Sequence, residues 1–359
     1  MSVNVNDIMK NINKKMQTKA ARFGNEFDPC QRIPTGIFEL DYAMGGGIPR
    51  GKVSVIFGYE SSNKTNVAQL IAKNDMLLSS HLDAHKKKKW LLVDIENSYD
   101  LVWSTRLGIP VDQLIVIRPD YAEQAIDIID SFLDADDLEG VILDSVAMVT
   151  PEAEVENSAE RVQVGGNALL ITKMMRLITR KLIKVQEQGR YPTVICINQI
   201  RHKIGVNFGN PETMAGGNAL RFQSGLSLRL NGKDRIIKAV DPNLPVCKTT
   251  SAIIKKAKVP YLAQSTDFDL AMRNFDRYGI GTSLDDNFLM NQLKDLGWMV
   301  RDGKGWLYND EKFDRQDDVI ASIYEDRDYC QTVKEAIIKT RMVETHGVEA
   351  WVDYQKPYQ

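Results

Sequence analysis

One eight-residue segment has the residue types and the setting of a loop that binds phosphate. It follows a predicted strand, opens a predicted helix and reads Gly58-Tyr59-Glu60-Ser61-Ser62-Asn63-Lys64-Thr65. This is the P-loop pattern G-x-x-x-x-G-K-[ST] in all but one place. The backbone N–H groups of such a loop converge on a β-phosphate. Lys64 is expected to reach the β- and γ-phosphates, and Thr65 to ligate Mg²⁺. The segment therefore predicts a site for a nucleoside triphosphate.

Asn63 is the departure from the pattern, because the second glycine of a P-loop belongs at this position. After glycine, asparagine readily adopts a left-handed backbone, so the loop can keep its shape. Its side chain could nevertheless crowd the phosphates or compete for their hydrogen-bond donors. Two hypotheses follow: a protein that hydrolyses the triphosphate, and a protein that binds it with little hydrolysis.

Three polar residues stand at the ends of apolar segments and would complete a hydrolytic site. Asp144 ends the run VILD and is typical of an acid that holds Mg²⁺. Glu96 ends WLLVDIE and is a candidate base that orients the attacking water. Gln199, near the end of TVICINQI, can bond a γ-phosphate and shift when that phosphate leaves, as in an order–disorder switch. Each residue alone is an ordinary strand end, but beside a P-loop they predict nucleotide hydrolysis.

Strands and helices that alternate along the chain must position these residues. Short apolar segments predict strands at 53–58, 90–96, 114–119, 140–145 and 193–200, with helices between them. That alternation is typical of a mainly parallel, doubly wound sheet in an α/β fold. Ligands of such sheets bind beyond the carboxyl ends of the strands, and the candidate site residues fall at those ends.

The composition narrows the class of protein. The 359 residues are 43% hydrophobic and 26% charged, as in globular proteins, and suffice for two domains or one large one. No apolar run is long enough for a membrane-spanning helix, and the N-terminal segment lacks the apolar stretch of a secretory signal. The four cysteines lie far apart with no C-x-x-C pair. This spacing argues against a disulfide framework or a zinc site and predicts a cytoplasmic location.

Positive charge is concentrated in the middle of the chain. Residues 161–260 carry 18 Lys and Arg against 4 Asp and Glu, whereas the segments on either side are acidic. A basic segment of this kind predicts a polyanionic partner that meets one face of the protein. A helix predicted at 167–184 places Lys173, Arg176 and Arg180 on one face. This face is either a row of cations that contact phosphates or a solvated surface.

A segment of unusual composition follows the predicted strand that contains Gln199. Residues 201–218 are rich in Gly and Asn, with Arg201 and Lys203 at one end. A backbone that can approach closely donates N–H groups to phosphates, and Ile204 could wedge between bases. The segment therefore predicts a loop that binds nucleic acid.

Together these motifs resemble the RecA family of homologous-recombination ATPases. The longest similar stretch, residues 198–220, reads NQIRHKIGVNFGNPETMAGGNAL and looks like the family's second DNA-binding loop without a gap. GYESSNKT, LDSVAMVTPEAEVE and GGGIPRGKV are also similar, and the resemblance covers about residues 31–300. It implies a RecA-like P-loop ATPase core that uses ATP and Mg²⁺, forms helical filaments on single-stranded DNA and pairs that strand with homologous double-stranded DNA. A metabolic P-loop kinase would have no use for residues 198–220.

The resemblance also implies roles for individual residues around ATP. Lys64 and Thr65 would bind the nucleotide and Mg²⁺, and Glu96 would activate water. Asp144 would be the Walker B acid, and Gln199 would couple the γ-phosphate to DNA.

Further positions match the family's contacts to the base and to a neighbouring subunit. Asp100 and Trp103 match the positions that contact adenine, with Trp103 in place of a smaller aromatic residue. Lys255, with Lys256 or Lys258, resembles a lysine pair that reaches a neighbour's ATP. The stretch AIIKKAKVP is one residue shorter than the family's, so the identity of the second lysine stays open.

The implied DNA contacts lie in two loops and one helix. The first loop, about residues 156–166, is longer here than in bacterial members, and Arg161 is its expected basic contact. The expected set is Arg161, Lys173, Arg176, Arg180, Arg201, Lys203, Ile204, Gly205, Asn210, Gly216, Gly217 and Asn218.

We expect four segments along the chain. They are a polymerisation segment at 1–30, the ATPase core at 31–282, a small C-terminal α/β domain at 283–345 and a tail at 346–359. A helix at 5–22 would pack on the next subunit of a filament. The implied partners are single-stranded DNA, homologous duplex DNA and further copies of the chain, with no membrane. The implied location is the bacterial cytoplasm, or the host cytoplasm if the protein is virus-encoded.

Overall fold

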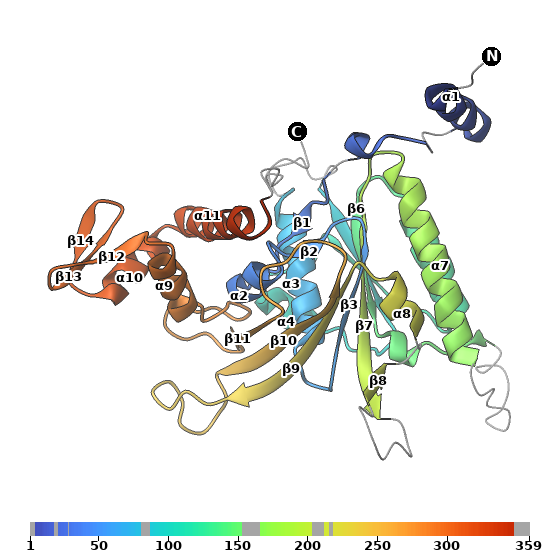
Figure 1. Ribbon diagram of the computed structural model, residues 1–359. Helices are drawn as coiled ribbons and strands as arrows, with labels where there is room; N and C mark the ends of the chain where they lie inside the picture. Colours follow the sequence, from blue (N-terminus) through green and yellow to red (C-terminus); the bar gives the residue numbers. More distant parts are fainter. Residues whose placement is uncertain are drawn as a thin grey trace.

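A large twisted sheet lies at the centre of the molecule (Figure 1). The structure is a computed structural model that describes residues 4–17, 21–27, 29–79, 87–152, 166–202, 212–214 and 218–347. Within these residues the strand order is β11-β10-β9-β3-β7-β6-β4-β5, and β8 pairs with β7. The strands are β3 (Val53–Gly58), β4 (Lys89–Asp94), β5 (Leu114–Ile117), β6 (Leu138–Asp144), β7 (Thr193–His202), β8 (Glu212–Met214), β9 (Leu226–Arg235), β10 (Cys247–Ala257) and β11 (Ser265–Ala271).

Parallel pairing dominates this sheet. From β9 through β3, β7, β6 and β4 to β5, each strand runs parallel to its neighbour, whereas β10 and β11 extend the sheet in antiparallel fashion. The α/β fold with a mainly parallel sheet, predicted from the alternating apolar segments, is confirmed. The antiparallel extension from β9 to β11 was not among the predicted strands.

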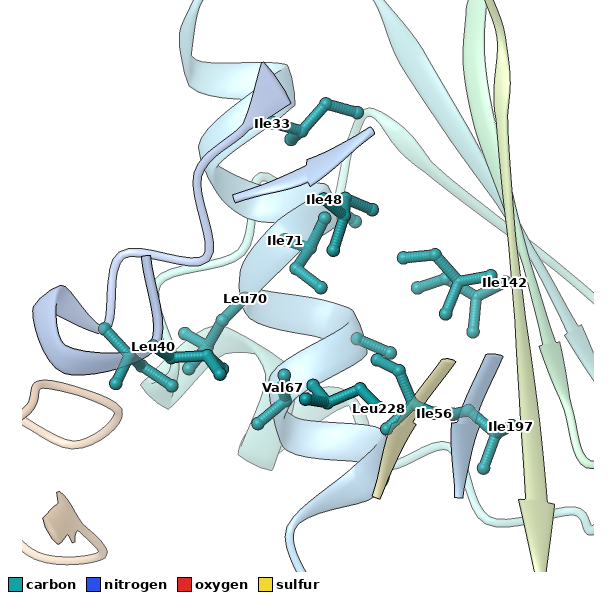
Figure 2. Close-up of a cluster of buried hydrophobic side chains, with 14 of the residues drawn as sticks. Ile33, Leu40, Ile48, Ile56, Val67, Leu70, Ile71, Ile142, Ile197 and Leu228 are labelled. Carbon is teal, nitrogen blue, oxygen red and sulfur yellow. The ribbon is translucent and has the colours of Figure 1, made fainter. Parts of the chain in front are cut away.

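In β3, β4, β5, β6 and β7, alternate side chains enter two different cores, as the two-residue period of a strand requires. One core packs Ile56, Ile142, Ile197 and Leu228 against α3 (Lys64–Leu77), and Figure 2 shows these side chains beside the helix. The neighbours of Ile56, Ile142 and Ile197 along β3, β6 and β7 enter the core on the opposite face, under α5 (Ala122–Phe132) and α7 (Gly166–Gln186). The sheet is therefore doubly wound.

The remaining elements around the sheet are short. They are β1 (Arg32–Ile33), β2 (Ile48–Pro49), α2 (Phe38–Ala43), α4 (Leu101–Arg106), α8 (Asn218–Gln223) and the 3₁₀ turns η1 (Gly24–Glu26) and η3 (Val146–Met148). β1 and β2 pair antiparallel beside α3.

The C-terminal part has its own core. It contains α9 (Asp286–Asp295), β12 (Met299–Asp302), β13 (Gly305–Tyr308), β14 (Glu311–Phe313), α10 (Gln316–Glu325) and α11 (Arg327–His346). The strands form a small antiparallel sheet, and buried side chains such as Leu293 and Ile337 pack between it and the helices. Phe38 of α2 belongs to the same core, so this part packs directly on the part of the molecule that contains the large sheet.

The N-terminal helix α1 (Val5–Met16) lies apart from the sheet (Figure 1). Its apolar stripe, Val5, Ile8, Ile12 and Met16, is exposed, and the helix has no buried residue. The predicted extent of 5–22 is wrong, because Gln17 adopts a left-handed conformation with φ of 53° and ends the helix. No helix within the described residues is long and apolar enough to cross a membrane.

Candidate nucleotide and DNA site

The P-loop connects the end of β3 to the start of α3. Close contact with β9 explains the glycine at its start, because a Cβ on Gly58 would lie 2.1 Å from the carbonyl oxygen of Leu230. Lys64 folds back over the loop and donates from Nζ to the carbonyl oxygen of Tyr59 at 2.5 Å. Burial lowers the pKa of Lys64, against the opposing effect of the Asp144 and Glu96 carboxylates.

A cavity of about 230 Å³ opens above this loop. Its lining includes Glu60, Ser61, Ser62, Asn63, Lys64, Thr65, Asn66, Glu96, Asp144, Gln199 and Lys248. The order β3-β7-β6-β4 explains this composition, because parallel neighbours bring their carboxyl ends to one edge of the sheet. The structure therefore brings the P-loop together with Glu96, Asp144 and Gln199.

Thr65 and Asp144 form the pair that could hold a metal ion. The Thr65 hydroxyl donates to Asp144 Oδ2 at 2.7 Å. Burial, together with the nearby Glu96 and Asp94 carboxylates, raises the pKa of Asp144 to about 6, against the opposing effects of the Thr65 hydrogen bond and Lys64. A hydroxyl and a carboxylate beside a phosphate loop fit Mg²⁺, which prefers hard oxygen ligands and keeps several waters.

Two side chains from neighbouring strands donate hydrogen bonds to one oxygen of Glu96. Gln199 Nε2 donates to Glu96 Oε1 at 2.9 Å, and the Ser145 hydroxyl donates to the same atom. Glu96 follows β4, Ser145 follows β6, and Gln199 lies in β7. The candidate base and the candidate γ-phosphate sensor are thus in direct contact.

Asp94 orders the loop that leads from Glu96 to Asp100. Its carboxylate accepts hydrogen bonds from the Ser98 and Tyr99 backbone N–H groups at 2.9 and 3.1 Å, and from Arg118 Nε at 3.1 Å. Sequence reasoning gave Asp94 no such role, although an acid that precedes a polar loop is a common sign of local backbone capping.

The two expected base contacts lie at the start of α4. Asp100 caps this helix by accepting from the Trp103 backbone N–H at 2.6 Å. The Trp103 indole is half-buried, and its Nε1 donates to Asn66 Oδ1 of α3 at 2.9 Å. Trp103 is therefore tied to the helix that begins with the P-loop lysine.

Asn63 has the left-handed backbone that its position in the loop requires, with φ of 65°. Its side chain is buried, and Nδ2 donates to Thr250 Oγ1 of β10 at 2.8 Å. Its Oδ1 accepts from Asn66 Nδ2 at 3.1 Å. Sequence reasoning missed Asn66 and Thr250, and only Asn66 carried a signal, being polar and next to the loop.

The three lysines at the end of β10 differ in their surroundings. Lys256 Nζ donates to the carbonyl oxygens of Arg221 and Phe222 at 2.6 and 2.8 Å, at the end of α8. Lys255 lies where the pairing of β10 with β9 shifts register, and both it and Lys258 are exposed. None of the three is among the described residues that line the nucleotide cavity of the same chain.

Lys173, Arg176 and Arg180 are all exposed on α7. The helix buries its other side, including Met174 and Ile178, in the core of the sheet. Spacings of three and seven residues place the three cations along one outward stripe.

Most of the two expected DNA loops lies outside the described residues. This applies to Arg161, Lys203, Ile204, Gly205, Asn210, Gly216 and Gly217. The ends of the second loop are described: the backbone of Arg201 pairs with Thr213 between β7 and β8, and Asn218 begins α8. The pairing of β7 with β8 thus places His202 and Glu212 opposite each other, on the strand that contains Gln199 and its partner.

Comparison with known proteins identifies the family. A family model described as the RecA N-terminal domain matches residues 3–274. Protein RecA of Desulfovibrio desulfuricans is 39% identical over 267 residues, which cover 74% of this chain and 67% of that protein. Protein RecA of Nautilia profundicola is 36% identical over 68% of this chain and 66% of its own length. Protein RecA of a Synechococcus species is 34% identical over 89% of this chain and 79% of its own length. The chain therefore belongs to the RecA family of recombinases.

Proposed function

We propose that the protein is a DNA-dependent ATPase that forms filaments on single-stranded DNA and catalyses homologous pairing and strand exchange. The observation that carries this proposal is the hydrogen bond between Gln199 and Glu96, because it joins the candidate base to the strand from which residues 203–217 extend. The relatives named Protein RecA support the same function.

The geometry supports a division of labour around a bound triphosphate. The Lys64 ammonium would exchange the Tyr59 carbonyl for phosphate oxygens. Thr65 and Asp144 would hold Mg²⁺, and the ion would neutralise part of the phosphate charge. Glu96 would orient the attacking water and accept its proton.

Gln199 would link hydrolysis to DNA. Its amide lies beside Glu96, within reach of the place where a γ-phosphate would stand, and its strand continues into the pairing of β7 with β8. A shift of Gln199 on loss of the phosphate would therefore move the start of the loop that contacts DNA. The exposed cations Lys173, Arg176 and Arg180 would bind the DNA backbone along α7.

Filament formation would use the apolar stripe of α1. Val5, Ile8, Ile12 and Met16 lie on one side of a helix that buries none of its residues in its own chain. A second copy of the chain would cover this stripe. Lys255 and Lys258, exposed at the end of β10, are the lysines we assign to the neighbour's ATP, because Lys256 is held by α8.

A homologous-pairing assay tests the proposal. The protein is loaded on a labelled single strand with ATP and Mg²⁺, and joint molecules with homologous and with heterologous supercoiled duplex are counted. We expect products with the homologous duplex alone, and none with Lys64→Ala. Binding of single-stranded DNA without pairing, together with negligible ATP turnover, would favour a filament-forming protein that binds ATP and barely hydrolyses it.

A further inference from the structure

A chain of hydrogen bonds runs from β10 through the P-loop to the Trp103 indole. Thr250 accepts from Asn63, Asn63 accepts from Asn66, and Asn66 accepts from Trp103 Nε1. We propose that Thr250 and Asn66 are positioning residues, which together set the shape of the phosphate loop and the orientation of Trp103 toward the base. The inference rests on the proposed function in one respect, that ATP occupies the cavity.

Asn63 needs its partners because it is buried and has a left-handed backbone. Only 6% of the residue is exposed, so its amide group cannot rely on water. Thr250 Oγ1 accepts a hydrogen bond from Asn63 Nδ2 at 2.8 Å, and Asn66 Nδ2 donates to Asn63 Oδ1 at 3.1 Å. Both polar atoms of the amide are thus bonded to other side chains, so the amide does not compete with phosphate for the donors of the loop.

Asn66 is suited to its place because an amide has both a donor and an acceptor. It lies three residues after Asn63, so both side chains project from the same side of the helix start. Its Nδ2 meets Asn63 and its Oδ1 meets the indole N–H, which can only donate. The indole ring is thereby fixed in rotation relative to the phosphate loop.

β10 and β9 hold the loop from the side. Lys248 Nζ donates to the carbonyl oxygen of Ser61 at 2.8 Å, two residues along β10 from Thr250. Gly232 of β9 lies opposite Thr250, and a Cβ there would lie 2.8 Å from Ser62 Cα. The loop is thus packed closely against this part of the sheet, and Thr250 is a buried residue of β10 that bonds to it.

A double-mutant cycle on Thr250 and Asn63 tests the first half of the proposal. Thr250→Val keeps the shape and removes the acceptor, whereas Thr250→Ser keeps the acceptor. Asn63→Gly removes the amide that donates to Thr250 Oγ1. Equilibrium affinity for a fluorescent ATP analogue is measured for each variant, without DNA.

We expect Thr250→Val to weaken analogue binding about tenfold, as for an unpaired buried amide, and Thr250→Ser to bind like the unmodified protein. In the Asn63→Gly background, Thr250→Val should change binding less than twofold, because no amide is left unpaired. An equal loss in both backgrounds, or equal behaviour of Val and Ser, would overturn the role of Thr250. Should Thr250→Val fail to fold alone, its folding and binding in the Asn63→Gly background decide the same question.

Quenching of Trp103 fluorescence by acrylamide tests the second half. The Trp103 signal is the difference between each protein and its Trp103→Phe counterpart. We expect Asn66→Ala to make this signal more accessible to acrylamide and to weaken analogue binding, while Thr105→Ala on the exposed side of α4 changes neither. Unchanged quenching in Asn66→Ala would overturn the role of Asn66. If the unmodified protein binds no analogue, the proposed function fails, whereas quenching still reports on the positioning of Trp103.

Discussion

Gln199 donates a hydrogen bond to Glu96 across 2.9 Å, although 103 residues separate them along the chain. Glu96 follows β4 and Gln199 lies within β7, with β6 between these strands in the sheet. Ser145, which follows β6, donates to the same Glu96 oxygen. The candidate base is therefore held from two sides, and a displacement of Gln199 changes its surroundings directly.

Replacing Glu96 with Gln should stop hydrolysis and leave nucleotide binding intact. Gln keeps an oxygen that can accept from Gln199 and Ser145 but cannot take a proton from water. We expect turnover to fall about 100-fold or more, with ATP affinity within about threefold of the unmodified protein. Steady-state turnover and equilibrium binding check this. Glu325→Gln, on the exposed end of α10, is the matched control, and turnover at the normal rate in Glu96→Gln would assign the base elsewhere.

Gln199→Ala should uncouple DNA affinity from the state of the nucleotide. The amide is the proposed link between the γ-phosphate and the β7–β8 pairing that supports the DNA loop. We expect the ratio of single-stranded DNA affinities, measured by anisotropy with a non-hydrolysable ATP analogue and with ADP, to approach one. A ratio as large as that of the unmodified protein would exclude Gln199 as the link.

Alanine at Arg176 or Arg180 should weaken binding of single-stranded DNA and reduce its salt dependence. Each lost phosphate contact removes about 0.7 from the slope of log K against log salt for a single strand. Lys304→Ala removes the same charge from an exposed turn between β12 and β13 and should leave the slope unchanged. Slopes for the α7 variants equal to that of Lys304→Ala would remove the helix from the DNA site.

Stability should fall as the pH rises from about 4.5 to about 8, because of Glu39. Burial and the nearby Asp285 carboxylate raise the pKa of Glu39 to about 8, against the Ser283 hydrogen bond and Lys334. In this range the folded state keeps a proton that the unfolded state has lost, and deprotonation therefore favours unfolding.

Glu39→Gln should remove the part of this dependence that Glu39 contributes. The glutamine oxygen can still accept from Ser283, which donates to Glu39 at 2.7 Å. We expect a flatter profile of unfolding free energy from pH 5 to 9, and a gain on the order of 2 kcal/mol at the alkaline end. Urea denaturation at each pH checks this, and parallel profiles for the two proteins would contradict the assignment.

The parts of the site that come from local pattern could be predicted from the sequence. A P-loop between a strand and a helix, and acids or amides at the ends of apolar runs, place Lys64, Thr65, Glu96 and Asp144 at one edge of a parallel sheet. The family could be inferred from the sequence as well, because residues 198–220 resemble a DNA-binding loop along their whole length.

The parts that depend on distant contacts could not be predicted. Thr250 lies 187 residues from Asn63, and no local pattern relates a threonine in β10 to a phosphate loop. Lys256 resembled its two neighbours in sequence, but the carbonyl groups at the end of α8 hold it. The strands β9 to β11 were missed because charged residues interrupt their apolar alternation.

The most direct measurement is steady-state ATP hydrolysis by the intact protein, with and without single-stranded DNA. A DNA-dependent ATPase should show strong stimulation by DNA, lost in both Lys64→Ala and Glu96→Gln, with Asn63 a tolerated variation of the loop. ATP-dependent binding to DNA with negligible turnover under both conditions would contradict that function and leave a filament-forming protein that binds ATP without hydrolysing it.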